Sequence, residues 1–169
     1  MAETKIKPKI EEIASDYLNG NDLDNLLGFV AWMRANRMTP TFANKSKEGV
    51  NYTSRVCYLK LRHDSWYIWP AGKKDGYLHE YVHGFLTCEE LKELVSASLA
   101  PCMKDCSHQC NAGLGFTVTV CGKDYENICC CCPVRFHNPN EETLKEIKNI
   151  IEGKNNIKNT GGKGHGGNH

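Results

Sequence analysis

The amino-acid sequence predicts an α+β fold: an antiparallel sheet of two hairpins with about four helices, stabilised by a cysteine-rich zinc knuckle. Three observations lead to this fold class. Apolar residues recur at helical spacing in several capped segments. Two pairs of β-rich segments, each joined by a short turn, lie between them. Most of the ten cysteines lie in the second half of the chain.

The first two helices are predicted from apolar residues that share one face. The first covers residues 9–18 and is ended by Gly20, and the second covers residues 22–36. Their inward-facing residues are Ile10, Ile13, Ala14, Tyr17 and Leu18 in the first helix, and Leu23, Leu26, Leu27, Val30 and Met33 in the second.

Capping residues mark the other two helices. Thr87 and Glu90 form a T-x-x-E capping box at the start of the third, which Pro101 stops. The fourth begins at "NPNE", with Asn138 as the cap and Pro139 at the first helical position. The inward-facing residues are Cys88, Leu91, Leu94, Val95 and Leu99 in the third helix, and Leu144, Ile147 and Ile151 in the fourth.

Two hairpins are predicted from β-branched and aromatic residues. Residues 50–62 and 66–70 form the first, with "HDS" as its turn. Residues 115–121 and 125–136 form the second, joined across "GKD". The segment 71–86 contains glycine, aromatic residues and histidine, and its pattern supports no assignment.

The size and charge of the chain limit the kinds of protein to which it can belong. Its 169 residues suffice for one domain with an ordinary core, and 40% of them are hydrophobic. Because 21 lysines and arginines nearly balance 20 acids, the net charge does not favour nucleic acid as a partner. No apolar run approaches the ~20 residues that span a bilayer, and the charged N-terminus lacks the apolar stretch of a signal peptide. We therefore expect a cytoplasmic protein without membrane contact, and a protein partner stays an open option.

The domain is expected to cover residues 1–153, with the metal knuckle at residues 102–132. Residues 154–169 have almost no apolar side chain to bury, so we expect a flexible tail of glycine, asparagine, lysine and histidine. His165 and His169 in this tail could hold a metal loosely, although a solvated tail is the favoured interpretation.

The cysteines carry the main functional signal, because clustered cysteines in a reducing compartment are more often metal ligands or catalytic thiols than disulfides. Cys102, Cys106 and Cys110 lie in the polar loop "CMKDCSHQC", which offers no core to bury them. Zinc needs soft, deprotonated ligands at tetrahedral corners. The second hairpin can return a fourth ligand from the "CCCC" run, and we select Cys129, with Cys131 next. The sequence thus predicts a structural Zn²⁺ site in a binding or regulatory module.

The other cysteines and one histidine complete this hypothesis. His108 lies inside the loop and could replace Cys106 or Cys110 as a ligand. Cys57, Cys88 and Cys121 are expected to be ordinary packed residues, since free cysteine is among the most buried residue types.

Two alternative functions remain open. His79, Glu80 and His83 satisfy H-E-x-x-H, a zinc motif of hydrolases in which the glutamate is the general base, but Gly84 would break the required helix. The same cysteines could hold an iron–sulfur cluster or act as redox thiols, although the radical-type C-x3-C-x2-C spacing is missed by one residue. The zinc module is favoured over an enzyme, and no catalytic residue is assigned.

Aromatic side chains also gather near basic ones around the first hairpin. Such platforms can stack single-stranded bases. Within a strand, however, half of these side chains should face the core, and that interpretation is favoured. The residues concerned are Trp66, Tyr67, Trp69, Tyr77 and Tyr81, near Lys60, Arg62, Lys73 and Lys74.

The stretches "LLGFVAWMRANRMTP", "VCYLKL" with "SWYIW", "GKDYENIC" and "VRFHNPNEETLKEIKNIIE" follow one another along the chain. Together they resemble small, uncharacterised cysteine-containing proteins of anaerobic Gram-positive bacteria. The resemblance covers most of the chain up to Gly153, and it implies a recurrent fold without an established activity. The "CCCC" run departs locally from this pattern, so the cysteine that corresponds to a ligand is left open.

Overall fold

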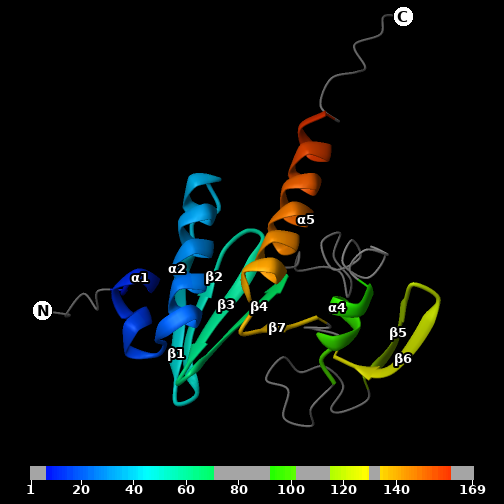
Figure 1. Ribbon diagram of the computed structural model, residues 1–169, viewed down its shortest axis with the longest axis horizontal. Helices are drawn as coiled ribbons and strands as arrows, with labels where there is room; N and C mark the ends of the chain where they lie inside the picture. The colour runs from blue at the N-terminus through cyan, green and yellow to red at the C-terminus, as the bar shows by residue number, and fades with distance from the viewer. Residues whose placement is uncertain (1–6, 71–91, 102–114, 130–133, 161–169) are drawn as a thin grey trace, which may run out of the picture.

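The computed structural model describes residues 7–70, 92–101, 115–129 and 134–160 (Figure 1). Within these residues the fold is α+β, as predicted, with four α-helices and an antiparallel sheet of several strands. The helices are α1 (Ile10–Ile13), the 3-10 helix η1 (Ala14–Asp16), α2 (Gly20–Ala35), α4 (Lys92–Ala97) and α5 (Glu141–Thr160). The strands are β1 (Thr41–Ser46), β2 (Gly49–Thr53), β3 (Cys57–Arg62), β4 (Ser65–Pro70), β5 (Phe116–Val120), β6 (Lys123–Ile128) and β7 (Phe136–His137).

The larger sheet has the strand order β1-β2-β3-β4-β7, and every pair in it is antiparallel. The predicted first hairpin is confirmed as β3 and β4, whose register places Leu59 opposite Ile68 and Arg62 opposite Ser65. At the other side of β4, Tyr67 pairs with His137 of β7, so the strand just before α5 closes this sheet.

The predicted single strand over residues 50–62 is wrong, because the chain forms two strands there, β2 and β3. Ser54 lies at the break. Its hydroxyl accepts hydrogen bonds from the backbone N–H groups of Val56 (3.3 Å) and Cys57 (3.1 Å). Such local bonds from a serine side chain compete with strand pairing and favour a turn.

β1 is a strand that the sequence analysis does not predict. Its sequence "TFANKS" is mostly polar, and its side chains are largely exposed. Among the described strands it pairs with β2 alone, with Phe42 opposite Tyr52 and an irregularity between Phe42 and Asn44. An edge strand buries little, so it lacks the apolar alternation by which strands are recognised.

The second predicted hairpin is present as β5 and β6, but it forms a separate two-stranded sheet. The turn residues Cys121 (φ 48°) and Gly122 (φ 79°) both have positive φ, as a two-residue type I′ turn requires. The predicted return strand over residues 125–136 is wrong, because β6 ends at Ile128 and residues 136–137 belong to the larger sheet. The sequence places Pro133 between these two pieces, and a proline has no N–H to donate to a strand ladder.

The N-terminal helices differ from the prediction at one boundary. The predicted helix over residues 9–18 is shorter, since α1 ends at Ile13 and η1 follows. Gly20 begins α2 instead of ending the first helix, and its φ of 52° suits a glycine. The second helix otherwise lies where it is predicted, from residue 20 to residue 35.

The later helices also differ at their ends. α4 ends at Ala97, before the predicted stop at Pro101, and the predicted capping box of Thr87 and Glu90 lies outside the described residues. α5 begins at Glu141 and is capped by Asn140, whose side-chain oxygen accepts the N–H of Thr143 at 2.8 Å.

Asn138 is therefore not the cap, and it has another role. Its side-chain oxygen accepts the N–H of Trp66 at 2.8 Å, and its own N–H donates to the Trp66 carbonyl at 2.9 Å. At its C-terminal end α5 continues past Gly153 to Thr160, while residues 161–169 of the predicted tail lie outside the described residues.

The core lies between one face of the larger sheet and the helices α1, α2 and α5 (Figure 1). Burial alternates along β3, where Cys57, Leu59 and Leu61 are buried and the residues between them are half-buried. The rings of Phe29 in α2 and Trp66 in β4 lie 6.5 Å apart at their centroids. The predicted inward face of the last helix is confirmed, since Leu144, Ile147 and Ile151 are buried in the same core. Within the described part of the chain, no helix is both long and apolar enough to cross a bilayer.

Candidate functional site

Of the four predicted zinc ligands, the structure describes one. Cys129 follows the last residue of β6 and is 1% exposed. Cys102, Cys106 and Cys110 lie outside the described residues, as does His108. Among the described residues alone, no group of three or more histidine, cysteine or acidic side chains is arranged to hold a metal ion.

The described residues that immediately precede two of the predicted ligands pair with each other. Pro101, the residue before Cys102, forms an antiparallel bridge with Ile128, the residue before Cys129. The N–H of Cys129 donates to the carbonyl of Ala100 at 2.8 Å. The chain that leaves α4 therefore runs beside the chain that leaves β6.

A second pair of contacts joins the segment that leaves α4 to the segment that leads to β7. Leu99 forms an antiparallel bridge with Val134, and the N–H of Arg135 donates to the Ser98 carbonyl at 2.8 Å. The exit of α4 is thus held between the end of β6 and the segment that leads to β7. Cys129, at the start of the "CCCC" run, and Val134, two residues beyond the run, both pair with the segment that leaves α4.

A side-chain hydrogen bond fixes the second hairpin against α4. The hydroxyl of Tyr125 in β6 lies 2.9 Å from that of Ser96 in α4. Val118, Val120 and Ile128 of the hairpin are buried with Val95 of α4 in the hydrophobic core. The polar and apolar contacts together position the strand that delivers Cys129.

Cys57 is an ordinary buried cysteine, as predicted. It is 1% exposed, and its sulfur lies 3.7 Å from the Ser54 hydroxyl. Burial raises the pKa of the Cys57 thiol to about 12, although the hydrogen bond with Ser54 acts in the opposite direction. Such a thiol stays protonated at neutral pH and is a poor metal ligand. Cys121 is half-buried in the β5–β6 turn, and Cys88 lies outside the described residues.

The histidine motifs of the alternative hypotheses are not described either. His79, Glu80 and His83 lie outside the described residues, and so do His165 and His169. The H-E-x-x-H hydrolase therefore stays a prediction from the sequence.

The aromatic residues of the first hairpin divide between two faces, as the favoured interpretation predicts. Trp66 is fully buried in the core. On the other face, Tyr67 stacks on His137 with centroids 4.7 Å apart, and Trp69 stacks on Tyr58 at 5.8 Å. These rings thus fill cross-strand pairs within the sheet. Tyr77, Tyr81, Lys73 and Lys74 lie outside the described residues.

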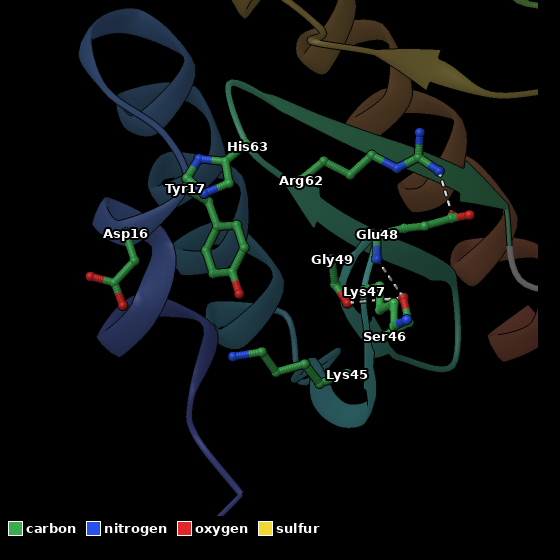
Figure 2. A pocket seen from close by; sticks show the side chains of 9 residues that line it. All are labelled: Asp16, Tyr17, Lys45, Ser46, Lys47, Glu48, Gly49, Arg62 and His63. Atoms are coloured by element: carbon green, nitrogen blue, oxygen red, sulfur yellow. Dashed lines mark hydrogen bonds and ion pairs between the residues drawn. The ribbon is translucent and has the colours of Figure 1, made fainter.

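The structure also contains a polar cleft of about 750 Å³ that the sequence analysis does not predict (Figure 2). One wall is the end of η1 with Tyr17, the opposite wall is the β1–β2 turn, and the end of β3 closes the third side. Its lining residues are Asp16, Tyr17, Lys45, Ser46, Lys47, Glu48, Gly49, Arg62 and His63.

Backbone and side-chain contacts hold the walls of this cleft in place. The N–H of Asp64, beside His63, donates to the Tyr17 carbonyl at 2.9 Å. Across the β1–β2 turn, the Ser46 hydroxyl accepts the N–H of Glu48 at 3.2 Å. The sequence "KSKEG" carries the signal for this wall, but two lysines around a turn are too common on surfaces to predict a cleft.

Comparison with protein-family models, curated proteins and solved structures gave no match to this chain.

Proposed function

We propose that the protein is a binding or regulatory module with a structural zinc site, in which Cys102, Cys106, Cys110 and Cys129 hold one Zn²⁺ ion. The observation that supports this proposal is the pairing of Pro101 with Ile128, because these two residues immediately precede the proposed ligands Cys102 and Cys129.

The pairing of Pro101 with Ile128 supports the choice of two of these ligands. Cys102 is the next residue in the sequence after Pro101, and Cys129 is the next after Ile128. The proposal therefore takes one ligand after each of two paired segments that lie far apart in the sequence.

The expected role of the ion is to fasten α4 to the second hairpin. In the described residues this junction has the bridge between Pro101 and Ile128, the backbone bond from Cys129 to Ala100, the hydrogen bond between Tyr125 and Ser96, and apolar packing around Val95. A metal whose ligands come from both sides would add binding free energy to the folded state only, since the ligands are dispersed in the unfolded chain. A structural role needs no open coordination position and no general base.

Two cysteines of equal burial allow a matched test. Cys129 and Cys57 are each 1% exposed, but only Cys129 is a proposed ligand. We expect Cys129→Ala and Cys106→Ser to lose bound zinc and to melt at lower temperature. Cys57→Ala should retain zinc and lose only the stability of a packed sulfur, about 1 to 2 kcal/mol.

The measurement is elemental analysis of the purified full-length chain, with its absorption spectrum and melting temperature. One zinc per chain and no visible absorption are expected, whereas a brown iron spectrum would favour the iron–sulfur alternative. Retention of both metal and melting temperature in Cys106→Ser and Cys129→Ala would refute the site as proposed.

A further inference from the structure

We propose that the cleft between Tyr17 and the β1–β2 turn binds a phosphate monoester that carries a planar ring, a ligand of the mononucleotide class. This site is separate from the proposed zinc site, and the two inferences stand or fall independently.

The charges around the cleft favour an anion. Lys45 and Lys47 both line it, and within the described part of the chain neither forms an ion pair. Arg62 is already paired, since its Nη2 lies 2.8 Å from a carboxylate oxygen of Glu48. Lys60 also contacts Glu48, at 3.0 Å. The charge of Glu48 is therefore balanced by Arg62 and Lys60, and not by Lys45 or Lys47.

The directions of the side chains agree with this charge balance. Figure 2 shows the Tyr17 hydroxyl and the Lys45 ammonium directed toward the same space. The carboxylate of Asp16 points away from that space, and the carboxylate of Glu48 is held by Arg62. Two hydrogen-bond donors thus converge where neither acid of the rim reaches.

The number of donors distinguishes a phosphate from a carboxylate. A phosphate monoester carries a charge near −2 at neutral pH and has three strong acceptor oxygens. Lys45 supplies a positive charge next to the Tyr17 hydroxyl, a neutral donor, and Lys47 adds a second positive charge from the β1–β2 turn. Three acceptor oxygens let a phosphate accept from the Tyr17 hydroxyl and the Lys45 ammonium together, and the positive charge of Lys47 on the same rim adds to the attraction.

The aromatic ring of Tyr17 is the reason for proposing a ligand that carries a planar ring. Its ring lies 5.9 Å from that of His63, at an interplanar angle of 45°. His63 is exposed and Tyr17 is half-buried, so the pair presents aromatic surface to the cleft. A volume of about 750 Å³ lies within the range of small-molecule sites. A ring placed against this aromatic wall leaves its phosphate near Lys45.

The test is a titration of the ¹⁵N-labelled full-length protein with AMP at low salt, with adenosine and inorganic phosphate as separate arms. We expect saturable shifts with AMP, centred on Tyr17, Lys45 and His63, and much weaker binding of either fragment alone. Lys45→Ala should weaken AMP binding at least about tenfold, and Tyr17→Phe should weaken it severalfold while the ring is kept.

Lys145→Ala is the matched control, because Lys145 is an exposed lysine of α5 outside this cleft. It should change AMP binding less than twofold. Three results would overturn the proposal: no saturable binding of AMP at millimolar concentration, equal losses in Lys45→Ala and Lys145→Ala, or inorganic phosphate or adenosine binding as tightly as AMP. The zinc content plays no part in this readout, so the two proposals are tested separately.

Discussion

Gly49 shows how a single residue constrains the fold at the rim of the cleft. Its φ is 145°, in a region that favours glycine, and a Cβ at this position would overlap the carbonyl oxygen of Leu61. We predict that Gly49→Ala destabilises the protein by about 2 kcal/mol or more, because backbone cannot move aside as a flexible side chain can.

Gly28 provides the control for this prediction. It lies inside α2, and a Cβ there would meet nothing within 4 Å. Gly28→Ala should therefore stabilise the protein by about 0.5 to 1 kcal/mol, the usual helix preference for alanine over glycine. Urea denaturation measures both variants. Equal stability of Gly49→Ala and the unmodified protein would contradict the close approach of Leu61.

At the scale of elements, the junction between β7 and α5 depends on two asparagines with different roles. Asn138 has a φ of 41° and binds the backbone of Trp66 through both its side chain and its N–H, whereas Asn140 caps α5. We predict that Asn138→Ala costs about 2 kcal/mol, since it loses a hydrogen bond and places alanine at positive φ. Asn140→Ala should cost about 1 kcal/mol, the usual value for a helix cap.

Asn138→Gly separates the contribution of the side-chain hydrogen bond from that of the positive φ. Glycine accepts the positive φ, so this variant should lose only the side-chain bond to Trp66 and cost less than Asn138→Ala. Thermal denaturation of the three variants gives the order. A larger loss in Asn140→Ala than in Asn138→Ala would show that the helix cap, and not the bond to Trp66, dominates this junction.

The same junction shows what the sequence could and could not predict. Periodicity and turn residues identified the hairpin of β3 and β4 and the inward face of α5, because each pattern extends over several residues. The sequence predicts the wrong cap, Asn138, because "NPNE" contains two asparagines and the spacing alone does not distinguish them. The sequence does not predict β1, because this polar edge strand has no apolar alternation.

The sites were less predictable than the elements. The two-residue strand β7 joins a different sheet from β6, and no local pattern reports such a long-range pairing. The cleft depends on Tyr17, the β1–β2 turn and Arg62, which are far apart in the sequence, so only the fold reveals it. Of the predicted zinc ligands, Cys129 lies within the described residues, where its N–H binds the carbonyl of Ala100 in the segment that follows α4.

At the scale of the whole molecule, the core contains the buried thiol of Cys57, and the ionisation of this thiol makes the free energy of unfolding depend on pH. Burial raises the pKa of Cys57 to about 12, whereas a thiol in the unfolded chain ionises near pH 8.5. The folded state therefore holds this proton more tightly, so its stabilising contribution is complete below pH ~8.5 and is lost as the pH rises toward 12.

We predict that the free energy of unfolding falls with rising pH above about 8.5, by about 1 kcal/mol per pH unit from this residue alone. Burial also raises the pKa of Tyr52 to about 12, so a second decline begins near pH 10. Urea denaturation between pH 8 and 10 isolates the thiol when the intact protein is compared with Cys57→Ala. Identical slopes for the two proteins would contradict the buried, protonated state of Cys57.

The central claim at this scale is that one cation joins the exit of α4 to the end of β6, where Pro101 and Ile128 pair. Zinc X-ray absorption of the purified full-length chain tests it most directly, because it reports the ligand atoms themselves. We predict one zinc per chain with three or four sulfur neighbours near 2.3 Å. A first shell of oxygen and nitrogen only, or no stoichiometric metal, would contradict the claim.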